Sequence, residues 1–144
     1  MKKILLACAA MAALLVSCSK GNDELIVGKW QKASEKFILY YDDGSDPLVE
    51  TSDTTTGGWV FNADGTGHSY SLADGRESVA AQLTYTVTDD SIFVSYSQSP
   101  VSICWKIETL NKRELRVSRR GITLIDPDGD KIGTVDMFLY LLRK

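Results

Sequence analysis

The sequence predicts an all-β domain, built as an antiparallel sandwich or barrel, and three observations support this prediction. Apolar and polar residues alternate with a period of two over most of the chain from Gly28 onward. Turn residues interrupt the alternation at about 8–12-residue intervals, the spacing typical of short antiparallel strands. All 3 prolines fall at breaks in the alternation, where a missing N–H group disturbs a sheet least.

The expected strands are joined by turns rich in glycine, asparagine and aspartate. These turns lie at residues 62–65, 73–76, 88–90, 110–113 and 126–130, and Pro100 makes a further break. Glycine adopts a positive φ without steric cost, and an Asp or Asn side chain can hydrogen-bond its own backbone, so such segments reverse the chain. The first clear strand is 59–61, and strands follow the successive turns up to 122–125.

The C-terminal segment 132–142 fits two patterns. A helix would share one face among Val135, Phe138, Leu139 and Leu142. A strand would share one face among Val135, Met137, Leu139 and Leu141. We favour the strand because the segment follows a hairpin-type turn.

Two further segments are less regular. Residues 77–83 have room for one helical turn, although no long helix is expected anywhere in the domain. Residues 42–58 are rich in Asp, Ser, Thr and Gly. We therefore expect a long loop there.

The N-terminus carries the features of a secretory signal. Lys2 and Lys3 form a basic start, and residues 4–16 contain no charge. This apolar run is shorter than the roughly 20 residues that a helix needs to cross a bilayer. It fits the apolar region of a signal peptide, which is removed from the mature protein.

The end of this apolar run points to a lipid anchor. Residues 14–18, Leu-Leu-Val-Ser-Cys, resemble the lipobox of bacterial lipoproteins. The resemblance implies cleavage before Cys18 and attachment of acyl chains such as palmitate to its thiol and its new amino group. Cys8 ends a similar short pattern, but almost no apolar run precedes it. We expect a signal peptide over 1–17, a lipidated tether over 18–24 and a folded domain over 25–144.

A lipid anchor determines where the protein resides. Each CH₂ group of an acyl chain contributes about 0.8 kcal/mol when buried, so several chains hold a protein firmly on a membrane. In bacterial lipoproteins a serine after the lipidated cysteine, here Ser19, is compatible with transfer to the outer membrane. We expect a lipid-anchored protein of the outer membrane, on either its periplasmic or its surface face.

Composition argues against several function classes. The formal net charge of −3 speaks against nucleic acid as a partner, because phosphate contacts require a basic face. The chain contains 1 histidine, His68, and no motif places a nucleophile beside it. The sequence has no Gly-x-Ser-x-Gly elbow, phosphate-binding glycine loop or dinucleotide fingerprint. We therefore expect neither an enzyme nor a cofactor.

Cysteines and acidic residues give no metal or disulfide signal either. Cys8 leaves with the signal peptide and Cys18 carries lipid, so Cys104 remains without a partner for an intramolecular disulfide. The alternate aspartates of 126–130 resemble part of a calcium loop, but the distal glutamate of such a loop is missing. Since Pro127 and the following glycine already explain a turn, no metal site is expected.

Four motifs resemble the lipocalin-like lipoproteins of Bacteroidetes. They are the Gly-Lys-Trp that ends at Trp30 and the segments 59–67, 85–90 and 105–115, in this order. The resemblance covers residues 25–144 and implies an up-and-down β-barrel of about eight strands, in which Trp30 caps one end.

A barrel of that size suggests one function and allows a second. It is just wide enough to be filled by its own side chains or to hold one small ligand. Apolar walls would favour a small hydrophobic ligand, and the candidate wall residues are Phe61, Tyr70, Tyr85, Val94, Ile103 and Trp105. These side chains would otherwise simply form the core. The alternative is an accessory or inhibitor lipoprotein that binds a protein partner through its loops, above all 42–58, or its outer face.

Overall fold

The computed structural model describes residues 21–144, so the expected signal peptide and Cys18 lie outside the described residues. One short helix precedes a series of nine strands in this part of the chain. The elements are α2 (Asn22–Ile26), β1 (Gly28–Tyr41), β2 (Leu48–Ser52), β3 (Gly57–Phe61), β4 (Thr66–Ala73), β5 (Arg76–Val87), β6 (Ser91–Tyr96), β7 (Ser102–Leu110), β8 (Glu114–Ile125) and β9 (Lys131–Arg143). No helix among these residues is long and apolar enough to cross a membrane.

The strands form one antiparallel sheet that closes on itself. From β3 to β9 each strand pairs with the next in sequence, and β1 pairs with both β3 and β9. Eight strands of the described chain thus make a closed barrel, and β2 lies outside it along β1. The predicted all-β, up-and-down barrel is confirmed.

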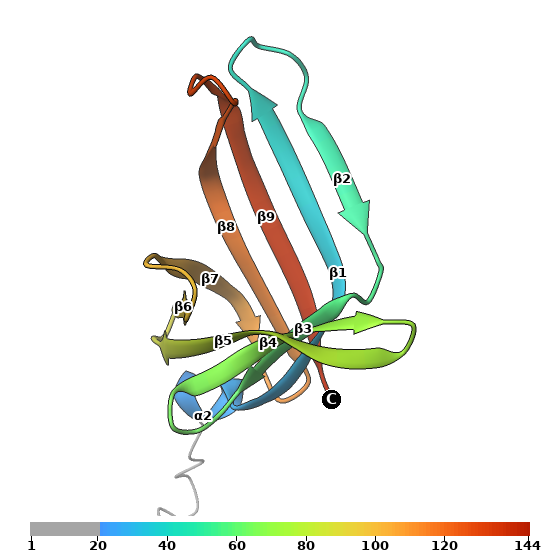
Figure 1. Ribbon diagram of the computed structural model, residues 1–144, viewed down its shortest axis with the longest axis vertical. Coiled ribbons are helices and arrows are strands. Elements are labelled where there is room, and N and C mark those ends of the chain that lie inside the picture. Colours follow the sequence, from blue (N-terminus) through green and yellow to red (C-terminus); the bar gives the residue numbers. More distant parts are fainter. Residues whose placement is uncertain (1–20) are drawn as a thin grey trace, which may run out of the picture.

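β1, β8 and β9 continue past the part of the sheet where they pair with β3 and β7, so part of the sheet projects beyond the barrel (Figure 1). β1 pairs with β3 only over its first residues, Gly28–Gln31, and then with β2 from Glu35 to Leu39. β7 pairs with β8 only as far as Ser118. We call the projecting part the extension: β2 together with residues 36–41 of β1, 119–125 of β8 and 131–138 of β9.

The contact between β1 and β3, which completes the barrel, requires glycine. A Cβ atom on Gly58 would lie 1.9 Å from the carbonyl oxygen of Trp30. A Cβ atom and a non-bonded oxygen do not approach this closely, so any side chain at this position would push the two strands apart. The same pairing brings Trp30 opposite Trp59.

One end of the barrel is closed by α2 and Trp30. Trp30 is 0% exposed, and its indole N–H donates a hydrogen bond of 2.6 Å to the carbonyl of Ile26. The guanidinium of Arg143 lies 4.4 Å from the centre of the Trp30 ring and donates to the carbonyls of Val27 and Leu25. The end cap that the lipocalin resemblance implies for Trp30 is therefore present.

Four local features refine the predictions from the sequence. Asn22 donates hydrogen bonds to the carbonyls of Thr88 and Asp89, so packing onto the barrel begins at α2. The expected long loop 42–58 is wrong in part, because it contains β2 and the start of β3. The helical turn at 77–83 is wrong, since these residues belong to β5. The C-terminal segment is a strand, as favoured.

Candidate functional site

The interior next to the closed end is filled by side chains. Phe61 and Val94, two of the candidate wall residues, are fully enclosed there, and Trp105 belongs to the same cluster. Tyr85 and Ile103 are partly buried against it. The cluster comprises Ile26, Trp30, Trp59, Phe61, Leu83, Ile92, Val94, Trp105, Leu115, Val117 and Leu141. This half of the barrel is therefore a packed core.

Tyr70 lies on the other side of the barrel wall. It pairs with Gly58, whereas its neighbour Ser69 pairs with the inward-facing Trp59. Because adjacent strand residues point to opposite faces, Tyr70 faces outward. Its hydroxyl donates to the carbonyl of Trp30 at 3.3 Å, and the Lys29 ammonium lies 4.8 Å from its ring centre. Burial raises the pKa of this phenol, but Tyr70 does not line the interior with the others.

Tyr85 lies near the closed end. Its ring packs edge-on against Phe61, with 4.7 Å between the ring centres, and its hydroxyl donates to the carbonyl of Asn62. Burial raises the pKa of Tyr85, and the charges of Asp64 and Asp23 raise it further. These contacts give Tyr85 a role in packing at this end.

The opposite end of the barrel is open and holds a pocket of about 210 Å³. Its walls are mostly apolar, and two of them are the rings of Trp59 and Trp105, whose centres lie 5.7 Å apart. The complete lining is Lys32, Glu35, Gly57, Gly58, Trp59, Trp105, Met137, Leu139 and Leu141. We call this the mouth pocket. Of the six candidate wall residues, Trp105 alone belongs to this lining.

Charged groups stand at the mouth pocket. The Lys32 ammonium and the Glu35 carboxylate form an ion pair of 2.8 Å, with their side chains 16% and 23% exposed. The guanidinium of Arg119 lies over the Trp105 ring, 5.6 Å from its centre. The site thus combines aromatic walls with a few oriented polar groups, as small-molecule sites do.

The extension continues the wall of the mouth pocket. Residues paired across antiparallel strands point to the same face, so the register defines rows on the inner face. The row of Glu35 and Leu139 lies at the pocket, and the next row contains Arg119, Met137, Phe37 and Glu50. Beyond it lies the apolar row of Ile122, Val135, Leu39 and Leu48.

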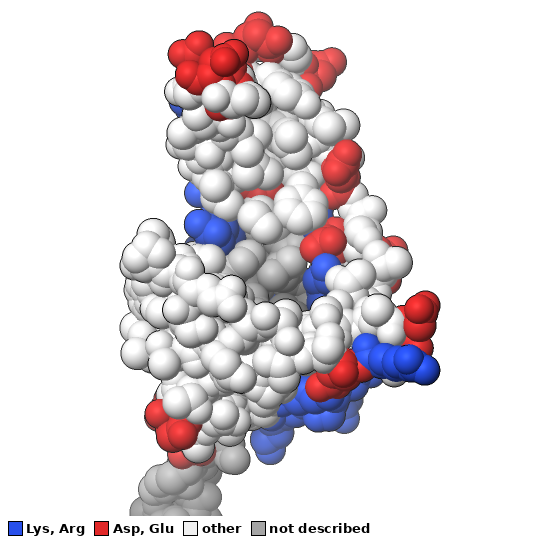
Figure 2. Space-filling model, in the orientation of Figure 1, with Lys and Arg blue, Asp and Glu red and all other residues white. Residues whose placement is uncertain are grey.

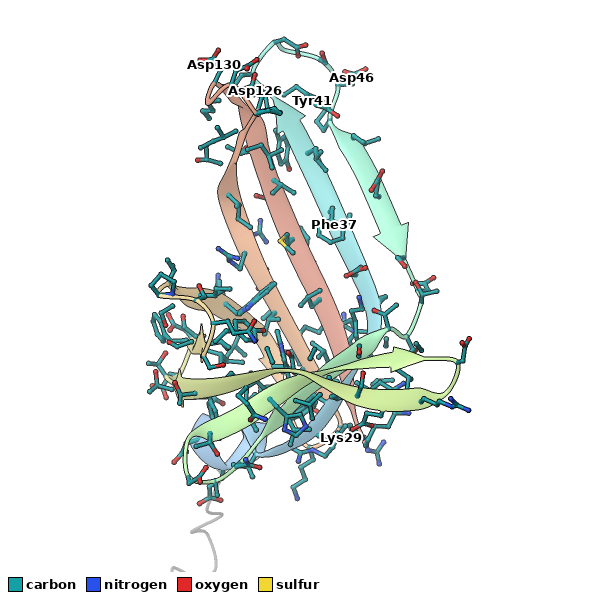
Figure 3. The ribbon with its side chains drawn as sticks, in the orientation of Figure 1. Lys29, Phe37, Tyr41, Asp46, Asp126 and Asp130 are labelled. Carbon is teal, nitrogen blue, oxygen red and sulfur yellow. The ribbon has the colours of Figure 1, made fainter. Side chains whose placement is uncertain are left out.

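Two views of the molecule show the region where the extension meets the barrel. Figure 2 shows a hollow where the extension meets the barrel, with charged side chains at its edges. Figure 3 shows Phe37 on the side of the extension above the barrel mouth. The loops at the far tip carry acidic residues, including Asp46, Asp126 and Asp130.

The aspartates of 126–130, Cys104 and His68 were considered as metal-binding or catalytic residues from the sequence. The Asp126 carboxylate accepts hydrogen bonds from the backbone N–H groups of Asp128 and Asp130, so it stabilises its own turn. No group of acidic, His or Cys side chains suited to hold a metal occurs among residues 21–144. Cys104 is exposed on β7, and His68 lies on β4 next to Gln82.

A closed, eight-stranded antiparallel barrel with a pocket at one end is the architecture of a class of small up-and-down barrel domains. Residues 26–117 match the family of the lipocalin-like domain, and the chain belongs to this family. The fold is similar to the crystal structure of a lipocalin-like protein from Bacteroides uniformis ATCC 8492, with 15% identity and a TM-score of 0.54. That likeness covers 83% of this chain and 99% of the other. No curated protein matches the sequence.

Sequence reasoning missed most of the mouth pocket. Its floor comes from β9, and its polar groups come from β1 and β8. The alternation of Met137, Leu139 and Leu141 was visible in the sequence, but their position opposite Lys32 and Glu35 depends on the pairing of β1 with β9. That pairing joins the two ends of the domain, and no local pattern reveals it.

Proposed function

We propose that this protein is a lipid-anchored binding protein of the cell envelope, which holds a small apolar ligand at the mouth of its barrel. The lipocalin-like fold suggests a ligand-binding barrel. The observation that carries the proposal is the mouth pocket with its two tryptophan rings. The signal and lipobox of residues 1–18 support the anchor.

The position of the ligand follows from the packing. The closed end is occupied by Trp30, Phe61 and their neighbours, so a ligand has no room there. At the mouth, Met137 and Leu139 are only partly buried and offer apolar surface beside the rings of Trp59 and Trp105. Burial of an apolar ligand on this surface is favourable by roughly 25 cal/mol for each Å² removed from water.

A neutral fluorescent probe tests this site. We expect N-phenyl-1-naphthylamine to bind the purified domain with a rise in its emission, because the probe enters an apolar environment. Met137→Trp fills the pocket and should weaken binding about fivefold or more. The measurement is a fluorescence titration of both proteins.

The neighbouring residue provides the matched control. Phe138→Trp adds an indole on the opposite face of β9, next to Arg120, and should leave the affinity unchanged. Absence of probe binding to the wild-type protein would contradict the proposal. Equal losses in both variants would place the probe elsewhere.

A protein partner is the second candidate, and the outer face of the extension favours it. Val49 and Ile125 are 53% and 61% exposed there, and Tyr40 and Ile132 are exposed nearby. Exposed apolar side chains that a partner could bury are a feature of interaction surfaces. For this candidate, we expect cross-linking in intact cells to yield one defined adduct. Changing these four residues to serine should abolish it, whereas the Met137→Trp variant should retain it.

A further inference from the structure

No other element among residues 21–144 covers the inner face of the extension (Figure 1), which carries mostly apolar residues. At its upper end Tyr41 and Leu48 are 36% and 42% exposed. The row of Ile122, Val135, Leu39 and Leu48 lies directly beyond the row that borders the mouth pocket. Pocket and extension therefore form one continuous surface, longer than a compact ligand would need.

Arg119 lies where the mouth pocket meets this surface. It pairs with Met137 across β8 and β9, and its guanidinium rests on the Trp105 ring. Within residues 21–144 it has no carboxylate in ion-pair contact, whereas Arg116 and Arg120 on the outer face reach Glu114 and Glu108. An arginine held over an apolar pocket thus keeps its N–H groups available for an anion.

The other charges of the inner face give this anion a direction. Glu50 stands in the same row as Arg119 but on β2, about 14 Å away across three strand spacings. Glu35 is already neutralised by Lys32. A negative group is therefore favoured on the β8 side of the face and disfavoured on the β2 side.

We propose that the ligand is an elongated anionic amphiphile, bound as a single molecule. Its head group accepts hydrogen bonds from Arg119, and its apolar body lies against the mouth pocket and the first apolar row of the extension. The planar guanidinium suits a carboxylate, sulfonate or phosphate because it can donate two parallel hydrogen bonds. This inference rests on the proposed function and adds the head group and the length of the ligand.

Two probes with the same aromatic skeleton test the head group. 1-Anilinonaphthalene-8-sulfonate carries a sulfonate that N-phenyl-1-naphthylamine lacks. Arg119→Met keeps a long side chain but removes the charge. We expect this change to weaken binding of the sulfonate about tenfold or more and to weaken binding of the neutral probe far less.

The adjacent arginine is the control. Arg120→Met removes the same charge from the opposite face and should alter neither affinity. Arg119→Lys keeps the charge without the planar fork, and it should lose part of the sulfonate affinity. Far-UV circular dichroism shows whether each variant is folded. Dodecanoate should displace the sulfonate probe from the wild type but only weakly from Arg119→Met.

The outcomes separate the two proposals. If the wild type binds neither probe, both the proposed function and this inference fail. If it binds the neutral probe, and Arg119→Met leaves sulfonate binding unchanged, the site stands and the assignment of the head group is wrong. A dimer in sedimentation that Leu39→Lys converts to monomers would show that a second copy covers the face, and would overturn the inference.

Discussion

Replacement of Trp30 by alanine is expected to lower the free energy of unfolding of the domain by about 3–5 kcal/mol, the usual cost of removing a large aromatic side chain from a core. The indole is 0% exposed, and its loss also removes the donor to the carbonyl of Ile26 and the ring under Arg143. Domains of this size have a total stability of about 5–15 kcal/mol, so the variant should lose a large fraction of its stability. Urea denaturation followed by circular dichroism measures the change.

A second aromatic residue serves as control for this substitution. Tyr41 is 36% exposed at the end of β1, and Tyr41→Ala should cost less than about 1 kcal/mol. Trp30→Phe keeps most of the packing and should lie between the two. If Trp30→Ala were no more destabilising than Tyr41→Ala, the closed end would not depend on this side chain.

The second large effect concerns the anchor. Replacement of Cys18 by alanine is expected to abolish incorporation of labelled palmitate and to remove the protein from the outer-membrane fraction. The physical reason is that acyl chains need the thiol as their attachment point, and each of their buried CH₂ groups contributes about 0.8 kcal/mol to membrane binding. Labelling in growing cells and membrane fractionation measure both effects.

Cys8 provides the matched control, because it ends a similar short pattern within the same signal. Cys8→Ala should keep both the label and the membrane location. The opposite result, with the label lost only in Cys8→Ala, would show that the signal peptide is cleaved before Cys8 instead of Cys18. Retention of the label in Cys18→Ala would refute Cys18 as the sole site of lipidation.

The hairpins of the barrel could be predicted from the sequence because their turns carry local chemistry. At Asp74 and Gly75 both φ angles are positive, 51° and 73°, as the type I′ turn of a two-residue hairpin requires. Gly65 and Gly129 likewise have positive φ in the turns expected at 62–65 and 126–130. Each of these signals lies within a few residues, so no knowledge of distant pairing is needed.

The elements that were missed lack such signals. β2 is a short edge strand whose residues are mostly exposed, so no buried face imposes an alternation on Leu48–Ser52. α2 has only five residues, and its first residues are polar, as those of a solvent-exposed tether would be. The burial of Ile26, which shows that the helix packs on the barrel, has no local signal in the sequence. In β5 the register shifts opposite Ser69 and Tyr70, and this bulge breaks the alternation over 77–83.

The candidate wall residues illustrate the same limit. Alternation correctly separates the two faces of a strand, and Phe61, Val94 and Trp105 do point inward. The regular register of β4 with β3 places Tyr70 on the outer face, because its neighbour Ser69 pairs with the inward-facing Trp59. Alternation also cannot tell the packed end of a barrel from its open end, because both ends carry apolar inward side chains.

The route by which the chain enters the barrel determines the orientation of an anchored molecule. Residue 21 leads into α2 at the closed end of the barrel, whereas the extension and its tip loops lie at the opposite end of the molecule (Figure 1). If the proposed lipid is attached at Cys18, upstream of α2, this arrangement would turn the opening away from the bilayer. An incoming molecule would meet it from the aqueous side, and the aspartates of the tip would stand farthest from the negatively charged lipid head groups.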